Sequence, residues 1–244
     1  MKKILFALAI MLSLFSCSSS DDSSQTSSDV LLRKVISDDG TSADLTYQGN
    51  KIVKITGSDG GYWNFTYKGD FISKIEIFDL NSKLIHRLEF YYSGNKLIQT
   101  KDYLEGVLFE KTDIVYNSDF NTRTRTQISY ESDTPDTTVY KDFYVKEDII
   151  KIQKLYSDGS VDYTRTYLYD NYNNPTKNIT GYKYIAGIVR LGGESSLHNT
   201  IKFTETSKNF SITSDTSYEY NSEGYPITET TRESGSTYIT QYFY

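Results

Sequence analysis

The chain repeats one nine-residue pattern three times without gaps: YQGNKIVKI (residues 47–55), YKGDFISKI (67–75) and YVKEDIIKI (144–152). Each copy has a tyrosine, then a polar turn, then Ile-x-Lys-Ile. A fourth copy, YSGNKLIQ (92–99), keeps the turn and the apolar pair. The Gly-Asn and Gly-Asp pairs tolerate positive φ, which tight turns between antiparallel strands require. The pattern therefore predicts β-hairpins.

Marker tyrosines recur along the chain at positions 47, 67, 92, 116, 144, 169, 220 and 244. Successive spacings are 20, 25, 24, 28, 25, 51 and 24 residues, so the one long gap is about twice the others. A unit of about 24 residues holds two extended runs and two turns, which is the length of a hairpin and its connection. The sequence thus predicts roughly eight such units.

Side chains alternate between the turns. Trp63 and Phe65 fall on one face with a polar residue between them, and Val53 and Ile55 lie opposite Lys54. We therefore expect an all-β fold of antiparallel hairpin repeats, forming one extended, twisted or curled sheet. One face should be apolar, and the other should carry tyrosine and lysine in water. A β-sandwich or a barrel is the alternative.

The N-terminal segment is typical of an exported protein. Lys2 and Lys3 precede an apolar run that is too short to span a membrane, so we interpret residues 1–16 as a signal peptide. Cys17 is the only cysteine, which excludes a disulfide within the chain. Residues 18–29 hold no apolar side chain and predict a flexible tether, so 17–29 precede a single domain at 30–244.

The segment Leu14-Phe15-Ser16-Cys17 resembles the lipobox of bacterial lipoproteins. The resemblance implies cleavage before Cys17 and attachment of diacylglycerol to its thiol, and two or more acyl chains anchor a protein stably. The Ser-rich start with paired aspartates also looks like the export signal of surface lipoproteins in Bacteroidetes-type bacteria. It implies an outer-membrane or cell-surface location, with the membrane as a partner through the lipid anchor.

The stretch YEYNSEGYPI (residues 218–227) resembles the YD (Rhs-type) repeat, and Tyr169-Asp170 carries the literal Tyr-Asp pair. In that family the repeat builds a curled sheet of hairpins, often a shell around toxin cargo. Eight units are too few to enclose cargo, so the shell role is not carried over.

Residues 185–199 break the rhythm inside the long gap. They predict a long glycine-containing loop in place of a tight turn. Such a loop is either a binding loop or a tolerated insertion in a decayed repeat.

The sequence predicts no catalytic residue, no metal site and no cofactor. His86 and His198 are the only histidines, too few for a histidine zinc site, and no Gly-x-Ser-x-Gly elbow surrounds Ser195 or Ser196. The net charge of −6 falls further once the two signal-peptide lysines are removed, which disfavours a nucleic acid partner.

These observations predict a non-catalytic cell-envelope lipoprotein with a binding or structural role, and a glycan or protein as ligand. The alternative is a carbohydrate-active envelope enzyme that uses Asp and Glu carboxylates. A third hypothesis is a transmembrane barrel, favoured by the aromatic end at residues 242–244. Lipidation at Cys17 and a mean hydropathy of −0.52 argue against it.

Overall fold

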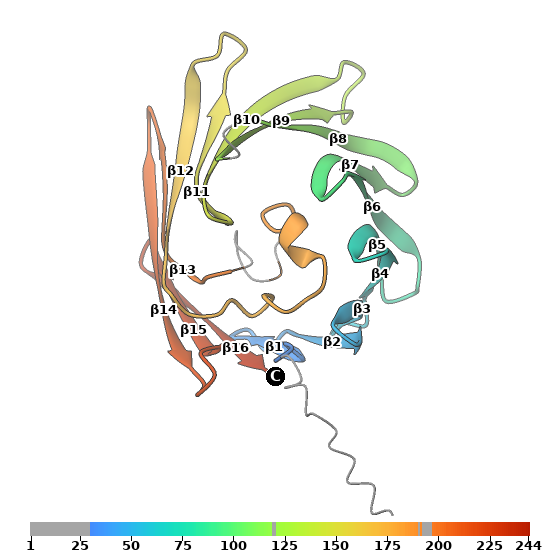
Figure 1. Cartoon of the computed structure of the whole chain (residues 1–244), viewed down its shortest axis with the longest axis vertical. Helices are drawn as coiled ribbons and strands as arrows, with labels where there is room; N and C mark the ends of the chain where they lie inside the picture. The colour runs from blue at the N-terminus through green and yellow to red at the C-terminus, as the bar shows by residue number, and fades with distance from the viewer. Residues whose placement is uncertain (1–29, 119–120, 190, 192–196) are drawn as a thin grey trace, which may run out of the picture.

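The computed structural model describes residues 30–118, 121–189, 191 and 197–244, which form sixteen antiparallel strands closed into one barrel (Figure 1). Each strand pairs with its neighbours in sequence, and β1 pairs with β16 to close the ring. The strands and one 3-10 helix are β1 (Lys34–Ser37), β2 (Ser42–Gln48), β3 (Lys51–Gly57), β4 (Tyr62–Lys68), β5 (Phe71–Phe78), β6 (Leu84–Ser93), β7 (Lys96–Leu104), β8 (Val107–Tyr116), β9 (Thr122–Ser129), β10 (Asp136–Val145), β11 (Asp148–Leu155), β12 (Val161–Tyr169), η1 (Tyr182–Tyr184), β13 (Thr200–Ser207), β14 (Ser211–Tyr220), β15 (Pro226–Glu233) and β16 (Ser236–Phe243).

Antiparallel hairpins are therefore confirmed, but the expectation of one extended or curled sheet is wrong. The sheet closes on itself, as in the barrel alternative. The signal peptide 1–16, the lipid site Cys17 and the tether 17–29 lie outside the described residues. No helix in the described part of the chain is long and apolar enough to cross a bilayer.

A β-bulge explains the Ile-x-Lys-Ile pattern. Ile52 and Ile55 both point into the barrel, with exposures of 0% and 7%, although residues three apart in a regular strand face opposite sides. In the β2–β3 pair Tyr47 lies opposite Ile52, and the residue before Tyr47 lies opposite Lys54, so Val53 is an extra residue. The predicted alternation of Val53 and Ile55 about Lys54 is wrong for this reason.

The same bulge recurs next to the marker tyrosine in five more strand pairs. Its extra residues are Ser73, Ile98, Ile150, Ile201 and Ile227. A bulge bends its strand and increases the local twist, and designed barrels use bulges in this way to curve a sheet. Six bulges at one end of the barrel therefore favour closure over an open sheet.

Some marker tyrosines also tie their hairpin to the one before it. The Tyr92 hydroxyl donates to the Ile72 carbonyl at 2.8 Å, and the Tyr169 hydroxyl donates to the Ile149 carbonyl at 2.7 Å. Ile72 and Ile149 each stand directly before a bulge residue, where the ladder is disrupted. The phenol thus supplies a hydrogen bond to a carbonyl beside the irregularity.

The 170–199 segment, between β12 and β13, folds into the barrel (Figure 1). We call this segment the plug, of which 190 and 192–196 lie outside the described residues. Its side chains Ile179, Tyr182 and Ile185 are at most 4% exposed and join the main apolar cluster, which also holds Ile72 and Leu97. The predicted loop at 185–199 is thus only part of a longer segment, which fills a wide barrel instead of lying on its surface.

The plug docks at the end of the barrel that carries both termini. The Thr180 amide donates to the Asn50 carbonyl at 2.9 Å, and the Asn178 side-chain amide donates to the Val30 carbonyl at 3.0 Å. Gly181 has φ +79°, and a Cβ there would lie 2.4 Å from the Asp70 carbonyl oxygen. Only glycine fits this approach to the β4–β5 turn.

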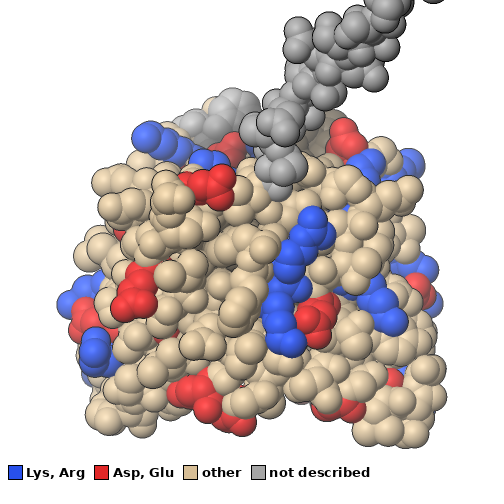
Figure 2. Space-filling model, turned by 90° about the horizontal axis from the view of Figure 1, so that it is seen from below, with Lys and Arg blue, Asp and Glu red and all other residues tan. Residues whose placement is uncertain are grey.

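The turns at the other end of the barrel, which we call the far end, are strongly acidic. They hold Asp38, Asp39, Asp59, Asp79, Glu105, Glu131, Asp133 and Asp158, with only Lys83 and Lys208 as basic residues. Acidic side chains appear along the lower edge of the side view in Figure 2. The far end therefore carries an excess of negative charge.

Candidate functional site

The main apolar cluster fills one side of the barrel interior, where the plug packs against the inner faces of β2 to β8. The opposite wall, from β9 to β16, has a smaller apolar cluster around Ile149, Ile152 and Tyr167 and buried polar side chains such as Arg123 and Asp142. A sixteen-strand barrel is too wide for its wall side chains to fill. Cavities therefore remain between the plug and the polar wall.

The first cavity, which we call the hydroxyl cavity, has a volume of about 390 Å³ and lies against β14, β15, β16 and β1. Most of its lining residues carry hydroxyl groups, including Ser214, Thr216, Tyr218, Thr231, Thr240 and Tyr242. One carboxylate, Glu229, lies among them. Hydroxyls both donate and accept hydrogen bonds, so the surface suits a ligand that does the same.

Glu229 organises this cavity. Its carboxylate accepts hydrogen bonds from the Tyr242 hydroxyl at 2.5 Å and from the Thr231 hydroxyl at 3.2 Å. Thr231 also shares a 2.9 Å hydrogen bond with Thr216 across the β14–β15 pair. Burial, followed by the charge of Glu229, raises the pKa of Tyr242 well above its usual value. Tyr242 therefore stays a neutral donor, and the hydroxyl positions are fixed before any ligand arrives.

A second polar group on the inner wall is built around Asp142. This carboxylate is 0% exposed and accepts from Arg123 Nε at 2.6 Å and from Arg125 Nε and Nη2 at 2.7 and 2.9 Å. Burial alone would raise the pKa of Asp142, but the two guanidinium groups lower it below its ordinary value. Arg165 and Glu205 form a further pair at 2.5 Å on β12 and β13. Sequence reasoning missed these residues because they meet only through the register of β9 with β10 and of β12 with β13.

Two carboxylates face each other between β7 and β8. Asp102 lies directly opposite Glu110 in the ladder, and His86 Nδ1 lies 3.3 Å from Asp102. Glu110 accepts hydrogen bonds from the side chains of Gln127 and Thr112. Burial, and then the charge of Asp102, raises the pKa of Glu110.

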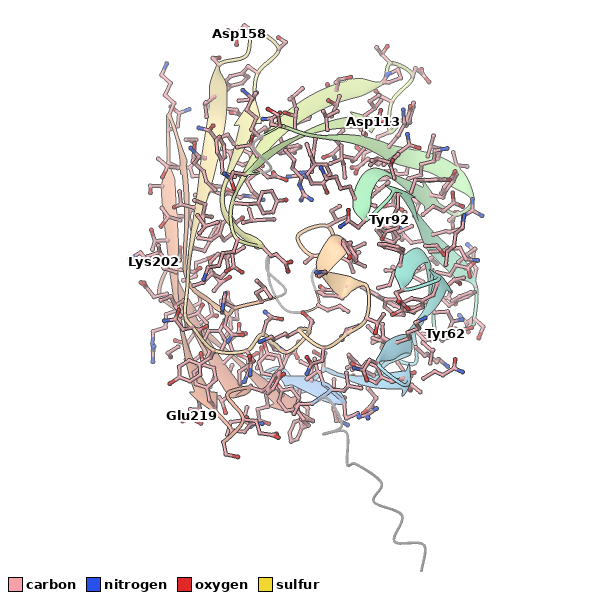
Figure 3. All side chains as sticks on the ribbon, in the orientation of Figure 1. Tyr62, Tyr92, Asp113, Asp158, Lys202 and Glu219 are labelled. Atoms are coloured by element: carbon pink, nitrogen blue, oxygen red, sulfur yellow. The ribbon has the colours of Figure 1, made fainter. Side chains whose placement is uncertain are left out.

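The outer wall is charged. Ion pairs lie along it at Lys74–Glu76 (2.9 Å), Lys111–Asp113 (2.7 Å) and Lys202–Asp215 (3.4 Å). Lys202 and Glu219 stand on the outside of the barrel and Tyr92 on the inside (Figure 3). A depression of about 910 Å³ over β4 to β7 is open to the outside and mixes Lys68, Phe71 and Ile98.

The remaining sequence-predicted residues occupy structural positions. His198 lies 2.7 Å from Asp148 and fastens the end of the plug to β11, far along the chain from His86. Asp158 accepts from the amide and hydroxyl of Ser160 within its turn, which lowers the Asp158 pKa. Ser195 and Ser196 lie outside the described residues. Among the residues that the structure describes, no cluster of three His, Cys, Asp or Glu could hold a metal ion.

No family model matches the sequence, and no curated protein matches it. Among solved structures, a porin-like protein from Bacteroides vulgatus ATCC 8482 superposes with a TM-score of 0.60 at 13% identity, covering 88% of this chain and 99% of that one. A porin-like protein from Bacteroides uniformis ATCC 8492 gives a TM-score of 0.40 at 12% identity, covering 83% and 76%. The chain therefore shares its closed barrel fold with the Bacteroides vulgatus protein over almost the whole of both chains.

Proposed function

We propose that this chain is a lipid-anchored envelope protein whose barrel stands in water and binds a polyhydroxylated ligand, a glycan, without altering it chemically. The observation that carries the proposal is the distribution of polarity across the wall. Charged pairs lie outside, and a hydroxyl-lined cavity lies inside.

The outer wall supports a barrel that does not cross a bilayer. A membrane-spanning barrel needs an apolar outer band about 25 Å tall, and a Lys or Arg at its midplane costs about 2–4 kcal/mol. Lys74 and Lys111 face outwards near the middle of β5 and β8, and Lys202 faces outwards as the third residue of β13. Each of these lysines lies beside an acidic partner. Such pairs suit contact with water.

The proposed anchor is the thiol of Cys17. Because both termini and the plug lie at one end of the barrel, a short tether would hold that end towards the membrane. The acidic far end would then point away from an anionic surface. We place the protein at the outer membrane or cell surface, in keeping with the Bacteroidetes-type export signal.

The anchor is tested in cells. Metabolic labelling with a palmitate analogue should label the wild-type protein and not Cys17→Ser, and mass spectrometry should find the acylated thiol at the mature N-terminus. After the Cys17→Ser change, the barrel should appear in the soluble fraction without detergent. An unlabelled wild type would contradict the anchor, and a variant soluble only in detergent would contradict the water-exposed wall.

The ligand is tested on the mature protein. We expect binding to one class of a glycan panel in isothermal titration, with the glycan recovered unchanged. Thr231→Val removes a hydroxyl from the cavity and should weaken binding about tenfold. The control Thr230→Val lies next to it on the outer face and should bind normally. The proposal fails if no glycan binds or if both variants bind like the wild type.

A second candidate function is glycoside hydrolysis, favoured by the opposed Asp102 and Glu110 carboxylates. A general acid needs a raised pKa, and burial raises that of Glu110. Turnover of a polysaccharide panel that disappears in Glu110→Gln, with the barrel still folded, would establish this function in place of simple binding. A panel without turnover would leave the pair with a structural role.

We also propose that the hairpins are a degenerate form of the YD-type repeat. The recurring bulge beside six of the eight marker tyrosines supports a common ancestral unit. Superposition of the β2–β3 hairpin on hairpins of solved YD-repeat proteins tests this idea, because a unit of that origin should carry its bulge at the same position.

A further inference from the structure

A second cavity of about 250 Å³ lies at the plugged end, between η1 and the wall from β7 to β11. Its lining is rich in cations and phenols: Lys96, Tyr116, Arg123, Tyr144, Lys146 and Lys183. Among the described residues that line it, Glu147 is the one acid, and Glu147 is already paired with Lys183 at 3.2 Å. The cavity therefore has an excess of positive charge.

Arg123 is the deepest cation of this cavity. It is 4% exposed, and the hydrogen bond to Asp142 uses its Nε alone. Asp142 is shared with Arg125, so one carboxylate faces two guanidinium groups and leaves a net positive charge. Among the described residues the Nη groups of Arg123 make no hydrogen bond, so they can donate to a ligand in the cavity.

Tyr144 adds an unsatisfied polar group to the same cavity. Its hydroxyl is buried and has no hydrogen-bond partner among the described residues. The equivalent marker tyrosines Tyr92 and Tyr169 both donate to a carbonyl of the preceding hairpin. A buried hydroxyl without a partner is rare in native proteins and calls for a partner that the free chain does not supply.

The repeat itself changes at this place. The hairpin before Tyr144, formed by β8 and β9, is paired without the bulge beside its marker tyrosine. Arg123 lies opposite the marker Tyr116, where four other units carry isoleucine or leucine. Among the described residues, the Tyr144 hydroxyl without an acceptor and the buried Arg123 guanidinium thus occur at the same place in the repeat. Core packing explains neither change, because an apolar residue fits this position in other hairpins.

We propose that this cavity binds a phosphate group, with the Arg123 guanidinium, the Lys96 and Lys146 ammonium groups and the Tyr144 hydroxyl as donors. Several converging cations with a neutral donor match the charge and the acceptor oxygens of phosphate. The volume of about 250 Å³ is large enough for one phosphate with a small substituent. The site is distinct from the hydroxyl cavity and goes beyond the proposed glycan binding.

Phosphate can reach the site from two sources, free in solution or as a lipid headgroup. The headgroup source depends on the proposed anchor, which would hold this end of the barrel against the membrane. Isothermal titration of the mature protein in non-ionic detergent distinguishes them, with inorganic phosphate in one arm and soluble glycerophosphoglycerol in the other. Tighter binding of inorganic phosphate indicates free phosphate as the ligand, and tighter binding of glycerophosphoglycerol indicates a lipid headgroup. Either result supports the phosphate site.

Tyr144→Phe provides the decisive comparison. It should weaken binding of the preferred ligand about tenfold and leave the unfolding midpoint unchanged or raised, because the lost hydroxyl makes no bond in the free protein. The outward Tyr91→Phe is the matched control and should bind normally. Thr231→Val should also bind normally, which separates this test from that of glycan binding. Wild-type affinity in Tyr144→Phe, or no binding at about 10 mM of either ligand, would overturn the proposal.

Discussion

Single residues account for much of the order in this barrel, and the marker tyrosines show how. A tyrosine in this repeat has an apolar ring for the interior and a hydroxyl that reaches the carbonyl beside a bulge. A phenylalanine would pack as well and leave that carbonyl without its partner. The repeated bulge thus accounts for part of the abundance of tyrosine.

The adjacent pair Tyr91 and Tyr92 tests this role. Tyr92→Phe should lower the free energy of unfolding by about 1 kcal/mol, because it removes the 2.8 Å bond to the Ile72 carbonyl. Tyr91→Phe removes only an exposed bond to Glu89, a bond that raises the pKa of Tyr91 to about 12, and should leave stability almost unchanged. Urea unfolding measures both, and equal effects would contradict the proposed role of the tyrosine hydroxyl.

Asp142 makes the free energy of unfolding depend on pH in the acidic range. Its pKa is lowered in the folded protein, so its contribution is complete above the unfolded value of about 3.9 and is lost as the pH falls towards the folded pKa. Asp142→Asn should cost about 3–5 kcal/mol at neutral pH, because two guanidinium groups lose their counter-charge. In urea unfolding near pH 3, the difference in the free energy of unfolding between Asp142→Asn and the wild type should become smaller. A difference that does not change with pH would show that the charge of Asp142 does not stabilise the fold.

At the level of elements, the sequence predicts the hairpins well, since turn residues and spacing are local properties. Which way an individual side chain points is harder to predict from the sequence. Val53 fits a regular alternation with Ile55, and only the pairing of β3 with β2 shows that Val53 is the extra residue. The plug was missed because its buried Ile179, Tyr182 and Ile185 have no strand or hairpin pattern and acquire a partner only inside a closed barrel.

Gly181 tests the docking of the plug. In Gly181→Ala the new Cβ meets the Asp70 carbonyl at 2.4 Å, so we expect the plug to shift and hydrogen exchange to rise in 174–189. The matched control is Gly235→Ala, which has φ +86° but no atom within 4 Å of the added Cβ. That change should cost only the backbone strain, about 1 kcal/mol. Equal exchange in both variants would show that the close approach does not hold the plug.

For the whole molecule, the sequence leaves closure open, with a barrel as one alternative to an open sheet. The repeat gives the number of hairpins, but the β1–β16 pairing joins segments about 200 residues apart and carries no local signal. The same holds for the two cavities. Residues such as Arg123 and Tyr144, or Thr216 and Glu229, meet only once strand order and register are fixed.

Removing β16 should test how much closure protects the molecule. A chain that ends at Gly235 exposes the pairing edges of β1 and β15, and free edges recruit other chains. We expect light scattering to show aggregation of this truncated protein at concentrations where the full barrel is monodisperse. A monomeric truncated protein of native circular dichroism would show that the ring is dispensable.

The β1–β16 seam has one more consequence. The Arg33 amide donates to the Phe243 carbonyl at 2.6 Å, so the start and the end of the domain are immediate neighbours. Chain order is therefore arbitrary in this architecture: a peptide linker from Tyr244 to Val30 with a new opening at the 105–106 turn would give a circular permutant with the same contacts. Such permutants would allow a reporter or a second module to be fused at the far end, away from the natural termini.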